Sequence, residues 1–474
     1  MAASAHDAAL ALTRLGLGAR PGEIARVAPD PRGWLTAQVR PQGAPQPPGD
    51  FPDSARRLDQ LQDYRAAASR PATPPGPAAW AMPGVMPGAV DPAAEAQREA
   101  RQAARRAIAD DTDQAFLARA RFAATTDDGF AERWALFWSN LFTVSLVKFD
   151  AGALADPFER EAIRPHVFGQ FEDLALAAEQ HPAMLFYLDQ ARSVGPDSPA
   201  GRRRSAGLNE NLAREMMELH TVGVDGGYTQ GDVTELARAL TGWSTPNARD
   251  RDNGVTGAFL FRANVHEPGA RTVMGKTYRQ AGLAQGQAIL RDLARNPATA
   301  RRLSHRIAAH FVADDPPPAL AARLERIWTR TGGDLSQVAQ ALIAAPEIWT
   351  PQPAKVKTPY EFVVSAHRAL GVWPQRLPPL RQALIAMGQP PFSPPSPQGW
   401  PDAAGDWAGP DALVKRLDWS RAMAESARGA DPVQTADQAL GDRMSARTRQ
   451  SVARAESRPE ALALLFMSPE FQRR

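Results

Sequence analysis

Apolar residues recur three to four positions apart along most of the 474-residue chain, in stretches divided by proline- and glycine-rich breaks. This spacing gathers them on one face of an α-helix, whereas a half-buried strand would alternate apolar and polar residues. The pattern therefore predicts a mainly α protein with a large multi-helix body. The expected helices cover residues 5–15, 54–69, 93–124, 128–142, 168–178, 182–190, 281–294, 297–312, 318–331, 334–344, 358–371, 410–427 and 458–466.

A β signal of substance is found at 255–278. Residues 259–261 and 272–274 are rich in aromatic and β-branched side chains and flank a turn that contains His266 and Glu267. Two such runs joined by a turn predict one small β-hairpin near 255–278. We expect His266 and Glu267 to protrude from its loop, where they could close over the charged segment described below.

Length and proline content suggest three regions. At 474 residues the chain exceeds the size at which one hydrophobic core usually stops growing. We expect an N-terminal helical region at 1–127 with a Pro-rich insertion near 71–92, a central helical region at 128–280 that includes the hairpin, and a C-terminal helical region at 281–474. The insertion has the composition of a flexible or polyproline-like segment.

Charged and amide side chains and a histidine are concentrated at 208–243, LNENLAREMMELHTVGVDGGYTQGDVTELARALTGW, which we call the signature segment. With Asn209 as the N-cap and a glycine as the stop, its first half forms a helix of about three to four turns. At about 100° per residue, Glu215 and Glu218 fall on one stripe beside the apolar face, and His220 lies about 140° from Glu215. Carboxylates so placed are partly desolvated unless an arginine, a metal or a substrate compensates them. A second element would have to complete a metal site.

The second half of the signature segment is a glycine-rich turn followed by another helix. Thr229 and Asp232 have the spacing of a capping box, which marks where that helix begins. An EF-hand calcium loop does not fit, because Gln230 and Leu236 stand where its glycine and its last glutamate are required. The segment is therefore either a structural helical hairpin, whose acids pair with arginines, or a reactive site.

The residue types of a reactive site suggest their roles. Glu215 would be the general base or a metal ligand, and a second nearby carboxylate would have a separated pKa. Arginines would hold an anionic group, and an amide would orient the substrate. The catalytic candidates are Glu215, Glu218 and His220; the substrate-binding candidates are Asn211, Arg214, Arg238 and Asp225; and the candidate ligands of a divalent metal of unknown identity are Glu215, Glu218, His266 and Glu267.

Composition narrows the classes of partner and chemistry. The formal net charge of +3 is small for this length and gives no case for nucleic acid. The chain has no cysteine, which excludes disulfides, thiol nucleophiles and thiolate metal sites. No run of about 18 apolar residues predicts a membrane span, and the N-terminal residues show no export signal. We expect a cytoplasmic protein, with export alongside a signal-bearing partner left open.

Several stretches resemble a known bacterial family. The signature segment, RLGLGARPGE near the start, RWALFWSNLFTVS at 133–145, GWP at 399–401 and SPEFQRR at the end are similar to the family called domain of unknown function 1800 (DUF1800), over nearly the whole chain. Members of that family often carry Asn-His-Phe where this chain has Asn140, Leu141 and Phe142. The resemblance implies no activity. It implies that the gene stands beside one for a DUF1501-like protein, a family whose members often resemble exported phosphatases or sulfatases.

Two hypotheses of different classes follow. In the first, the chain is a helical assembly or maturation partner of the co-encoded DUF1501-like protein, and its acids are structural. In the second, it is a hydrolase or group-transfer enzyme that uses Glu215 and Glu218 in acid-base or metal-assisted chemistry. A structural scaffold would hold both acids on arginines, whereas an enzyme would expose them in a cleft.

Overall fold

The computed structural model describes residues 5–69, 92–203, 207–350, 355–427 and 429–474. Helices dominate these residues, so the predicted mainly α fold is confirmed. The Pro-rich stretch near 71–92 lies almost wholly outside the described residues. In the first half of the chain the helices are α1 (Ala5–Leu10), α2 (Glu23–Val27), α3 (Pro31–Thr36), α4 (Ser54–Ser69), α5 (Pro92–Thr125), α6 (Gly129–Leu141), α7 (Phe149–Gly152), α8 (Ala155–Pro157), α9 (Phe171–Gln180), α10 (Pro182–Tyr187), α11 (Asn211–Glu215) and α12 (Gln230–Leu240).

Each helix predicted from the apolar period is present, with ends that differ by a few residues. The sequence pattern missed several shorter helices, among them α2, α3, α19, α22 and α23. In the second half of the chain the helices are α13 (Ala248–Asp252), α14 (Leu283–Arg295), α15 (Pro297–Phe311), α16 (Pro318–Thr331), α17 (Leu335–Ala344), α18 (Pro359–Leu370), α19 (Leu377–Ala386), α20 (Ala404–Trp407), α21 (Pro410–Ser426), α22 (Pro432–Leu440), α23 (Ala446–Ala453), α24 (Arg458–Met467) and α25 (Pro469–Gln472).

The strands pair differently from the expected hairpin. Strand β2 (Leu260–Phe261) pairs antiparallel with β1 (Trp243–Ser244), and β3 (Arg271–Val273) pairs antiparallel with β4 (Lys276–Tyr278). The hairpin within 255–278 is thus β3–β4, whose turn places Met274 and Gly275 at positive φ. The two runs taken as its strands, 259–261 and 272–274, do not pair with each other. Short strands carry too little pattern to reveal their partners.

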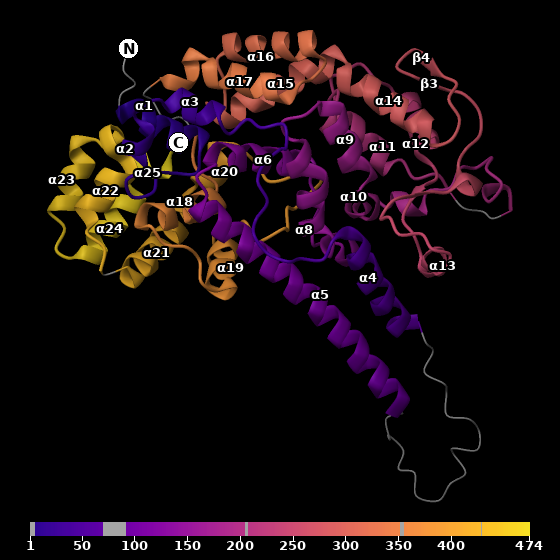
Figure 1. Ribbon diagram of the computed structural model, residues 1–474, viewed down its shortest axis with the longest axis horizontal. Helices are drawn as coiled ribbons and strands as arrows, with labels where there is room; N and C mark the ends of the chain where they lie inside the picture. The colour runs from indigo at the N-terminus through magenta and orange to yellow at the C-terminus, as the bar shows by residue number, and fades with distance from the viewer. Residues whose placement is uncertain (1–4, 70–91, 204–206, 351–354, 428) are drawn as a thin grey trace, which may run out of the picture.

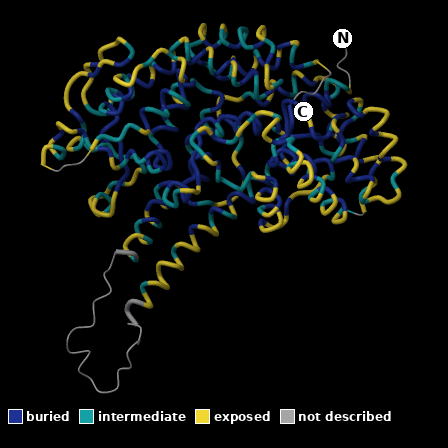
Figure 2. Tube along the Cα trace, turned by 180° about the vertical axis from the view of Figure 1, so that it is seen from behind, coloured by how far each residue is buried: buried dark blue, intermediate teal, exposed yellow. Residues whose placement is uncertain are grey.

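The body (Figure 1) contains two large hydrophobic cores, and Figure 2 shows that buried residues are concentrated in this body. The first is formed mainly by α6, α9, α10, the signature segment and α14 to α17. The second is formed mainly by α18, α19, α22 and α24, together with the last part of α5. The aromatic stripe of α6 packs into the first core, as its spacing predicts: Trp134, Phe137, Trp138 and Leu141 are all buried. The three regions expected from the proline breaks remain a prediction.

One element stands out from the body. Helix α4 and the first half of α5 run antiparallel and project from it as a pair, which we call the α4–α5 arm (Figure 1). Hydrogen bonds hold the pair together: Gln97 donates to the carbonyl of Ala67 at 2.8 Å, and Arg101 donates to Tyr64 at 3.1 Å. The other end of α5 enters the body and buries Phe116 in the second core. A single helix of 34 residues therefore links the arm to the interior.

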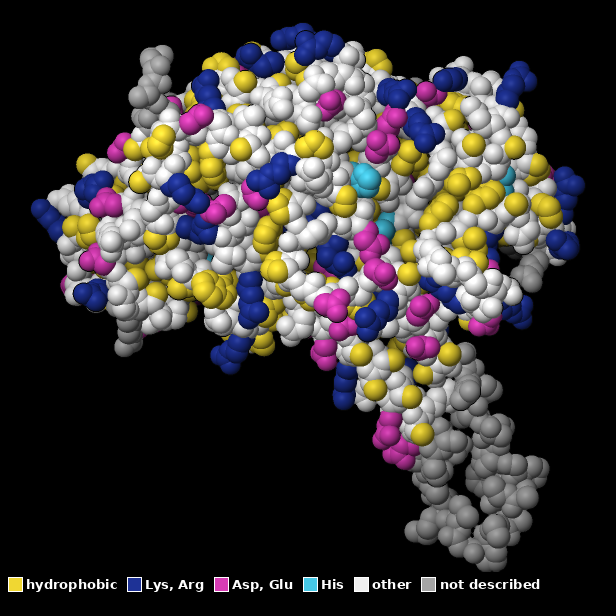
Figure 3. All heavy atoms as spheres, viewed as in Figure 1, with side chains coloured by type: hydrophobic (Ala, Val, Ile, Leu, Met, Phe, Trp, Pro, Cys, Tyr) yellow, Lys and Arg dark blue, Asp and Glu magenta, His cyan; other side chains and the backbone are white. Residues whose placement is uncertain are grey.

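Positive and negative side chains are interspersed over the face seen in Figure 3. Within the described part of the chain, no helix is both long enough and apolar enough to span a bilayer. The mixture of charges on this face agrees with the small net charge of the sequence.

Candidate functional site

The signature helix differs from the regular helix that its sequence predicts. It begins at Asn211 rather than beside an N-cap at Asn209, and after Glu215 it continues as a π-helical turn, η7 (Met216–His220). The Asn209 side chain still accepts a hydrogen bond from the Asn211 N–H at 2.8 Å. A π turn closes i→i+5 hydrogen bonds and so brings residues five apart closer in angle than an α-helix does. The angle of about 140° expected between Glu215 and His220 assumes a regular α-helix, and residues 216–220 depart from that geometry.

His220 is buried and forms a close pair with a residue outside the signature segment. Its Nδ1 lies 2.6 Å from Oε1 of Glu179, which is also fully buried on α9. The other ring nitrogen, Nε2, has no hydrogen-bond partner within the described residues. Sequence reasoning missed Glu179, because 41 residues separate the two.

Glu215 is half-buried, and within the described part of the chain its carboxylate makes no ion pair or hydrogen bond. Burial raises its pKa, and the carboxylates of Glu218 and Glu179 add to the increase, while His220 and Arg214 oppose it. A carboxyl group with a raised pKa and no fixed partner is of the kind that general acid-base catalysis uses.

Glu210 links the two helices of the segment. Glu210 accepts hydrogen bonds from Gln230 at 2.8 Å and from Thr234 at 2.7 Å, and it pairs with Arg214 at 3.3 Å. These contacts, the Thr234 bond first, lower the pKa of Glu210. Glu218 lies 3.5 Å from Arg214. Burial, and next the Glu218 carboxylate, raise the pKa of Tyr228 to about 12. Arg214 also donates to the Gln230 side chain at 2.9 Å, so it contacts both helices.

The second helix starts as its sequence predicts. Thr229 and Asp232 form a capping box, and the other Asp232 oxygen accepts a hydrogen bond from the Met274 N–H at 2.6 Å. This contact ties α12 to the β3–β4 hairpin. Arg238 pairs with Glu235 at 2.6 Å, and Asp225 is exposed on the turn.

The remaining predicted site residues do not gather around Glu215. Glu267 is buried rather than protruding from a loop: its carboxylate accepts a hydrogen bond from the Asp197 N–H at 2.8 Å. His266 lies 2.8 Å from the carbonyl of Thr241, and Asn211 is exposed. Among the described residues, no group of three or more His, Asp and Glu side chains is arranged to hold a metal ion.

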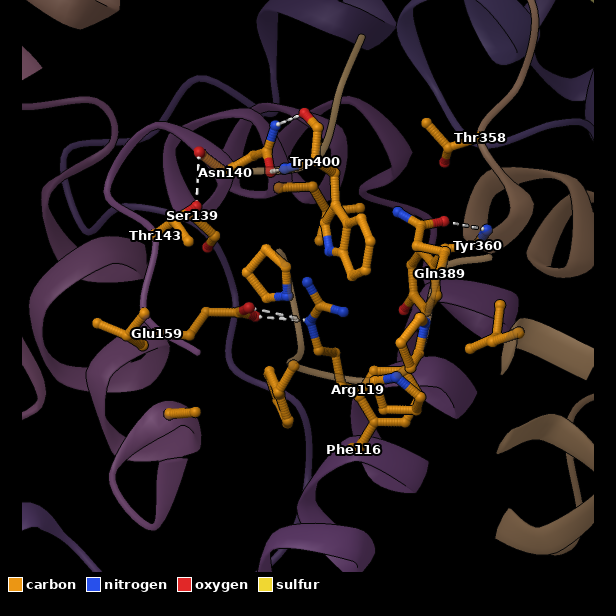
Figure 4. A pocket seen from close by; sticks show the side chains of 18 of the residues that line it. Phe116, Arg119, Ser139, Asn140, Thr143, Glu159, Thr358, Tyr360, Gln389 and Trp400 are labelled. Atoms are coloured by element: carbon orange, nitrogen blue, oxygen red, sulfur yellow. Dashed lines mark hydrogen bonds and ion pairs between the residues drawn. The ribbon is translucent and has the colours of Figure 1, made fainter. Parts of the chain in front are cut away.

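A cavity of about 140 Å³ lies where the two cores meet, between α5, α6, α18 and the loop that follows α19 (Figure 4). We call it the Arg119 cavity. Its walls are largely apolar side chains, which come from Phe116, Leu136, Val144, Phe158, Leu384, Phe392 and Trp400 and from four prolines. Polar and charged residues also line it, among them Arg119, Ser139, Tyr360, Gln389, His310 and the acids Glu159, Glu361 and Asp402. An apolar pocket with a few converging polar groups is the usual form of a small-molecule site.

Arg119 is held from one side. Its Nε donates a hydrogen bond to Oε1 of Glu159 at 3.1 Å and lies 2.9 Å from Oε2. Its guanidinium carbon lies 4.9 Å from the centre of the Tyr360 ring. Within the described residues, its terminal nitrogens Nη1 and Nη2 have no hydrogen-bond partner. In Figure 4 the guanidinium points into the open space below Trp400.

A chain of ion pairs fixes Glu159 in turn. Glu159 also accepts from Arg164, and Arg164 makes two bonds to Glu132, at 2.7 and 2.9 Å. Burial alone would raise the pKa of Glu159, but Arg119 and Arg164 together lower it to about 2. Two arginines and two glutamates thus form a neutral buried set, with Arg119 at the end that faces the cavity.

The cavity wall joins two stretches that the sequence places 260 residues apart. Asn140 donates to the Trp400 carbonyl at 2.9 Å and accepts from the Trp400 N–H at 2.7 Å. Gly399 has φ +83°, and a Cβ there would lie 2.4 Å from the Asn140 carbonyl oxygen. Leu141, the residue after Asn140, packs in the first core. No local motif marks Arg119, Tyr360 or Gln389, so sequence reasoning could not have found the cavity.

The family model described as "Protein of unknown function (DUF1800)" matches residues 10–473. The match includes both the signature segment and the Arg119 cavity. Comparison with curated proteins and with solved structures found no match. The comparisons therefore assign no role to the residues of the signature segment or of the Arg119 cavity.

Proposed function

The chain belongs to the DUF1800 family, and from this premise we propose that it is a helical assembly or maturation partner of a co-encoded DUF1501-like protein. The observation that carries the proposal is the α4–α5 arm, a helix pair that leaves the body and exposes most residues in the outer half of α5 (Figures 1 and 2). Between Glu95 and Ala107, no residue of α5 is buried.

The outer half of α5 is suited to contact with another protein. Exposed alanines at 96, 100, 103 and 107 follow helical spacing along one side, between arginines and glutamates. Alanine leaves room for a partner helix to approach closely, and the charges beside it would select that partner. The arm is therefore the surface on which we place the interaction.

The signature segment supports the same proposal. Glu210 and Arg214 join the two helices, Asp232 joins α12 to the hairpin, and Arg238 pairs with Glu235 inside α12. These charged side chains form contacts within the body, which is the role expected of structural rather than catalytic residues. A rigid body that carries a projecting helix pair is the arrangement expected of an assembly partner.

The test is co-expression of the full chain with the DUF1501-like protein encoded beside it, followed by size-exclusion chromatography. We expect one complex of both chains, lost when Ala100→Glu and Ala103→Glu are combined, because two carboxylates would then occupy the contact face. Ala422→Glu, at an exposed alanine of α21, is the matched control and should leave the complex intact. Separate elution of the wild-type chains, or a complex unaffected by the arm variant, would contradict the proposal.

One observation favours a second function, a hydrolase or group-transfer enzyme. Glu215 has a raised pKa and, in the part of the chain that the structure describes, no ion pair; it lies near the buried Glu179–His220 pair. In that case Glu215 would act as the base or as a ligand of a divalent metal, with Glu218 beside it. Metal analysis of the natively purified chain decides this: a stoichiometric divalent ion that is lost in Glu215→Ala would favour the enzyme over the assembly partner.

A further inference from the structure

We propose that the Arg119 cavity binds a small carboxylic acid with an apolar body. The inference is independent of the arm and of the signature segment, since it rests on side chains that neither of them contributes.

The polar lining of the cavity offers hydrogen-bond donors without partners. Tyr360 is buried. Among the residues that the structure describes, neither its hydroxyl nor that of Ser139 has a hydrogen-bond partner. Arg119 adds Nη1 and Nη2. Gln389 uses its carbonyl oxygen to accept from the Tyr360 N–H at 2.8 Å, and within the described residues its amide nitrogen donates to no other group. Buried donors left in this state cost free energy unless a ligand or water accepts from them.

The acceptors around the cavity are already engaged. Glu159 is held by Arg119 and Arg164. Glu361 is held by Arg133 and Arg474. The third acid of the lining, Asp402, lies 3.1 Å from His310 and 3.4 Å from Lys355. A cationic ligand would therefore find no free carboxylate, whereas a carboxylate ligand would meet two N–H groups of one guanidinium, the geometry in which arginine binds carboxylates best.

Size and wall chemistry restrict the rest of the ligand. A volume of about 140 Å³ is close to that of an apolar cavity of about 150 Å³ that accommodates benzene. The aromatic rings of Phe116, Phe392 and Trp400 and the side chains of Leu136 and Leu384 leave apolar contact as the main interaction with the body of the ligand. Branched aliphatic and single-ring acids fit this description, and a peptide or a nucleotide does not.

The experiment is isothermal titration of the full-length protein with isobutyrate and with benzoate. The neutral amides of the same shape, isobutyramide and benzamide, test the charge, and inorganic phosphate tests an anion that lacks an apolar body. We expect at least one acid to bind and to raise the melting temperature as its concentration rises. Its amide should bind at least about tenfold more weakly, because the amide lacks the charge that Arg119 recognises.

Two variants test the residues. Arg119→Gln should weaken binding of the acid at least about tenfold, and Tyr360→Phe, which keeps the ring and removes only the hydroxyl, about three- to tenfold. Arg121→Gln is the control on the same helix: Arg121 donates to the carbonyl oxygens of Pro374 and Gln375 and does not line the cavity. If Arg119→Gln does not fold, Tyr360→Phe still decides.

The proposal is overturned if neither acid binds, if an acid and its amide bind equally, or if Tyr360→Phe and Arg121→Gln bind the acid equally well. Equal binding of acid and amide would identify the cavity as an apolar void. Binding of phosphate as tight as that of benzoate would also overturn it, because the apolar walls would then contribute nothing.

Discussion

Replacing Glu132 by glutamine tests whether the buried ion pairs beside the Arg119 cavity stabilise the fold. The Glu132 carboxylate and the Arg164 guanidinium are both fully buried and share two hydrogen bonds, at 2.7 and 2.9 Å. Glutamine keeps the shape, removes the charge and turns an amide N–H toward an arginine N–H. Breaking a buried pair by removing one partner costs about 3–5 kcal/mol.

The expected loss lies near the lower end of that range. Arg164 keeps two bonds to Glu159, at 2.9 and 2.7 Å, and donates to the Pro45 carbonyl at 2.8 Å, so its charge is still partly compensated. We therefore expect Glu132→Gln to lower the free energy of unfolding by about 3 kcal/mol.

Urea unfolding followed by far-ultraviolet circular dichroism measures this loss, with an exposed ion pair as the control. Arg449 and Asp437 lie 2.5 Å apart with side chains that are about half exposed, at 50% and 47%. Asp437→Asn should change the free energy of unfolding by at most about 1 kcal/mol, because solvent screens such pairs. Equal losses in Glu132→Gln and Asp437→Asn would refute the claim that burial makes the inner pair important.

Three further outcomes follow from single residues. Burial lowers the pKa of His310 from 6.5 to about 4. The stability that the neutral ring contributes is therefore full above pH 6.5 and falls by about 3 kcal/mol as the pH drops toward 4. Urea midpoints measured from about pH 4 to about pH 7.5 should fall with pH in the wild type, and His310→Gln should remove most of that dependence. Burial raises the pKa of Glu215, so its ionised form is disfavoured in the folded protein, and the stability that the protonated form contributes at low pH is lost as the pH rises through the raised pKa. At pH 7, Glu215→Gln should be as stable as the wild type or slightly more so, within about 1 kcal/mol. A clear drop in the melting temperature would mean that a bound partner stabilises the Glu215 carboxylate. Gly399→Ala should cost clearly more than Gly388→Ala in urea unfolding, because both glycines have positive φ but only the first would press a Cβ against Asn140; equal costs would mean that the Asn140 carbonyl moves aside freely.

Most of the longer helices could be predicted from the sequence, whereas the strand pairing and the shorter helices could not. The period of apolar residues predicted α6 and its buried aromatic stripe because that face packs against the first core along its whole length. Short helices such as α2 and α23 were missed, since each has too few turns for a period to show. The pairing of β2 with β1 was missed for the same reason, as each strand has two residues.

The chemistry was predicted only where it is local. The capping box of Thr229 and Asp232 follows from their spacing, and the structure has it. The π turn after Glu215 has no sequence signature in this chain, yet it changes which side chains share a face. Arg119 and Tyr360 come together across more than two hundred residues, so only the packing of two cores could reveal that pair.

Helix α5 reaches from the tip of the arm to the wall of the cavity without a break, and at 1.5 Å per residue its 34 residues make a rod of about 50 Å. Because the helix is continuous, a protein that displaced its outer end would also shift Phe116 and Arg119, unless the helix bent. If assembly on the arm and occupancy of the cavity influence each other at all, the influence must be mutual and of equal size in both directions. Measuring how strongly the partner is held with and without the acid would therefore report on both ends of one helix.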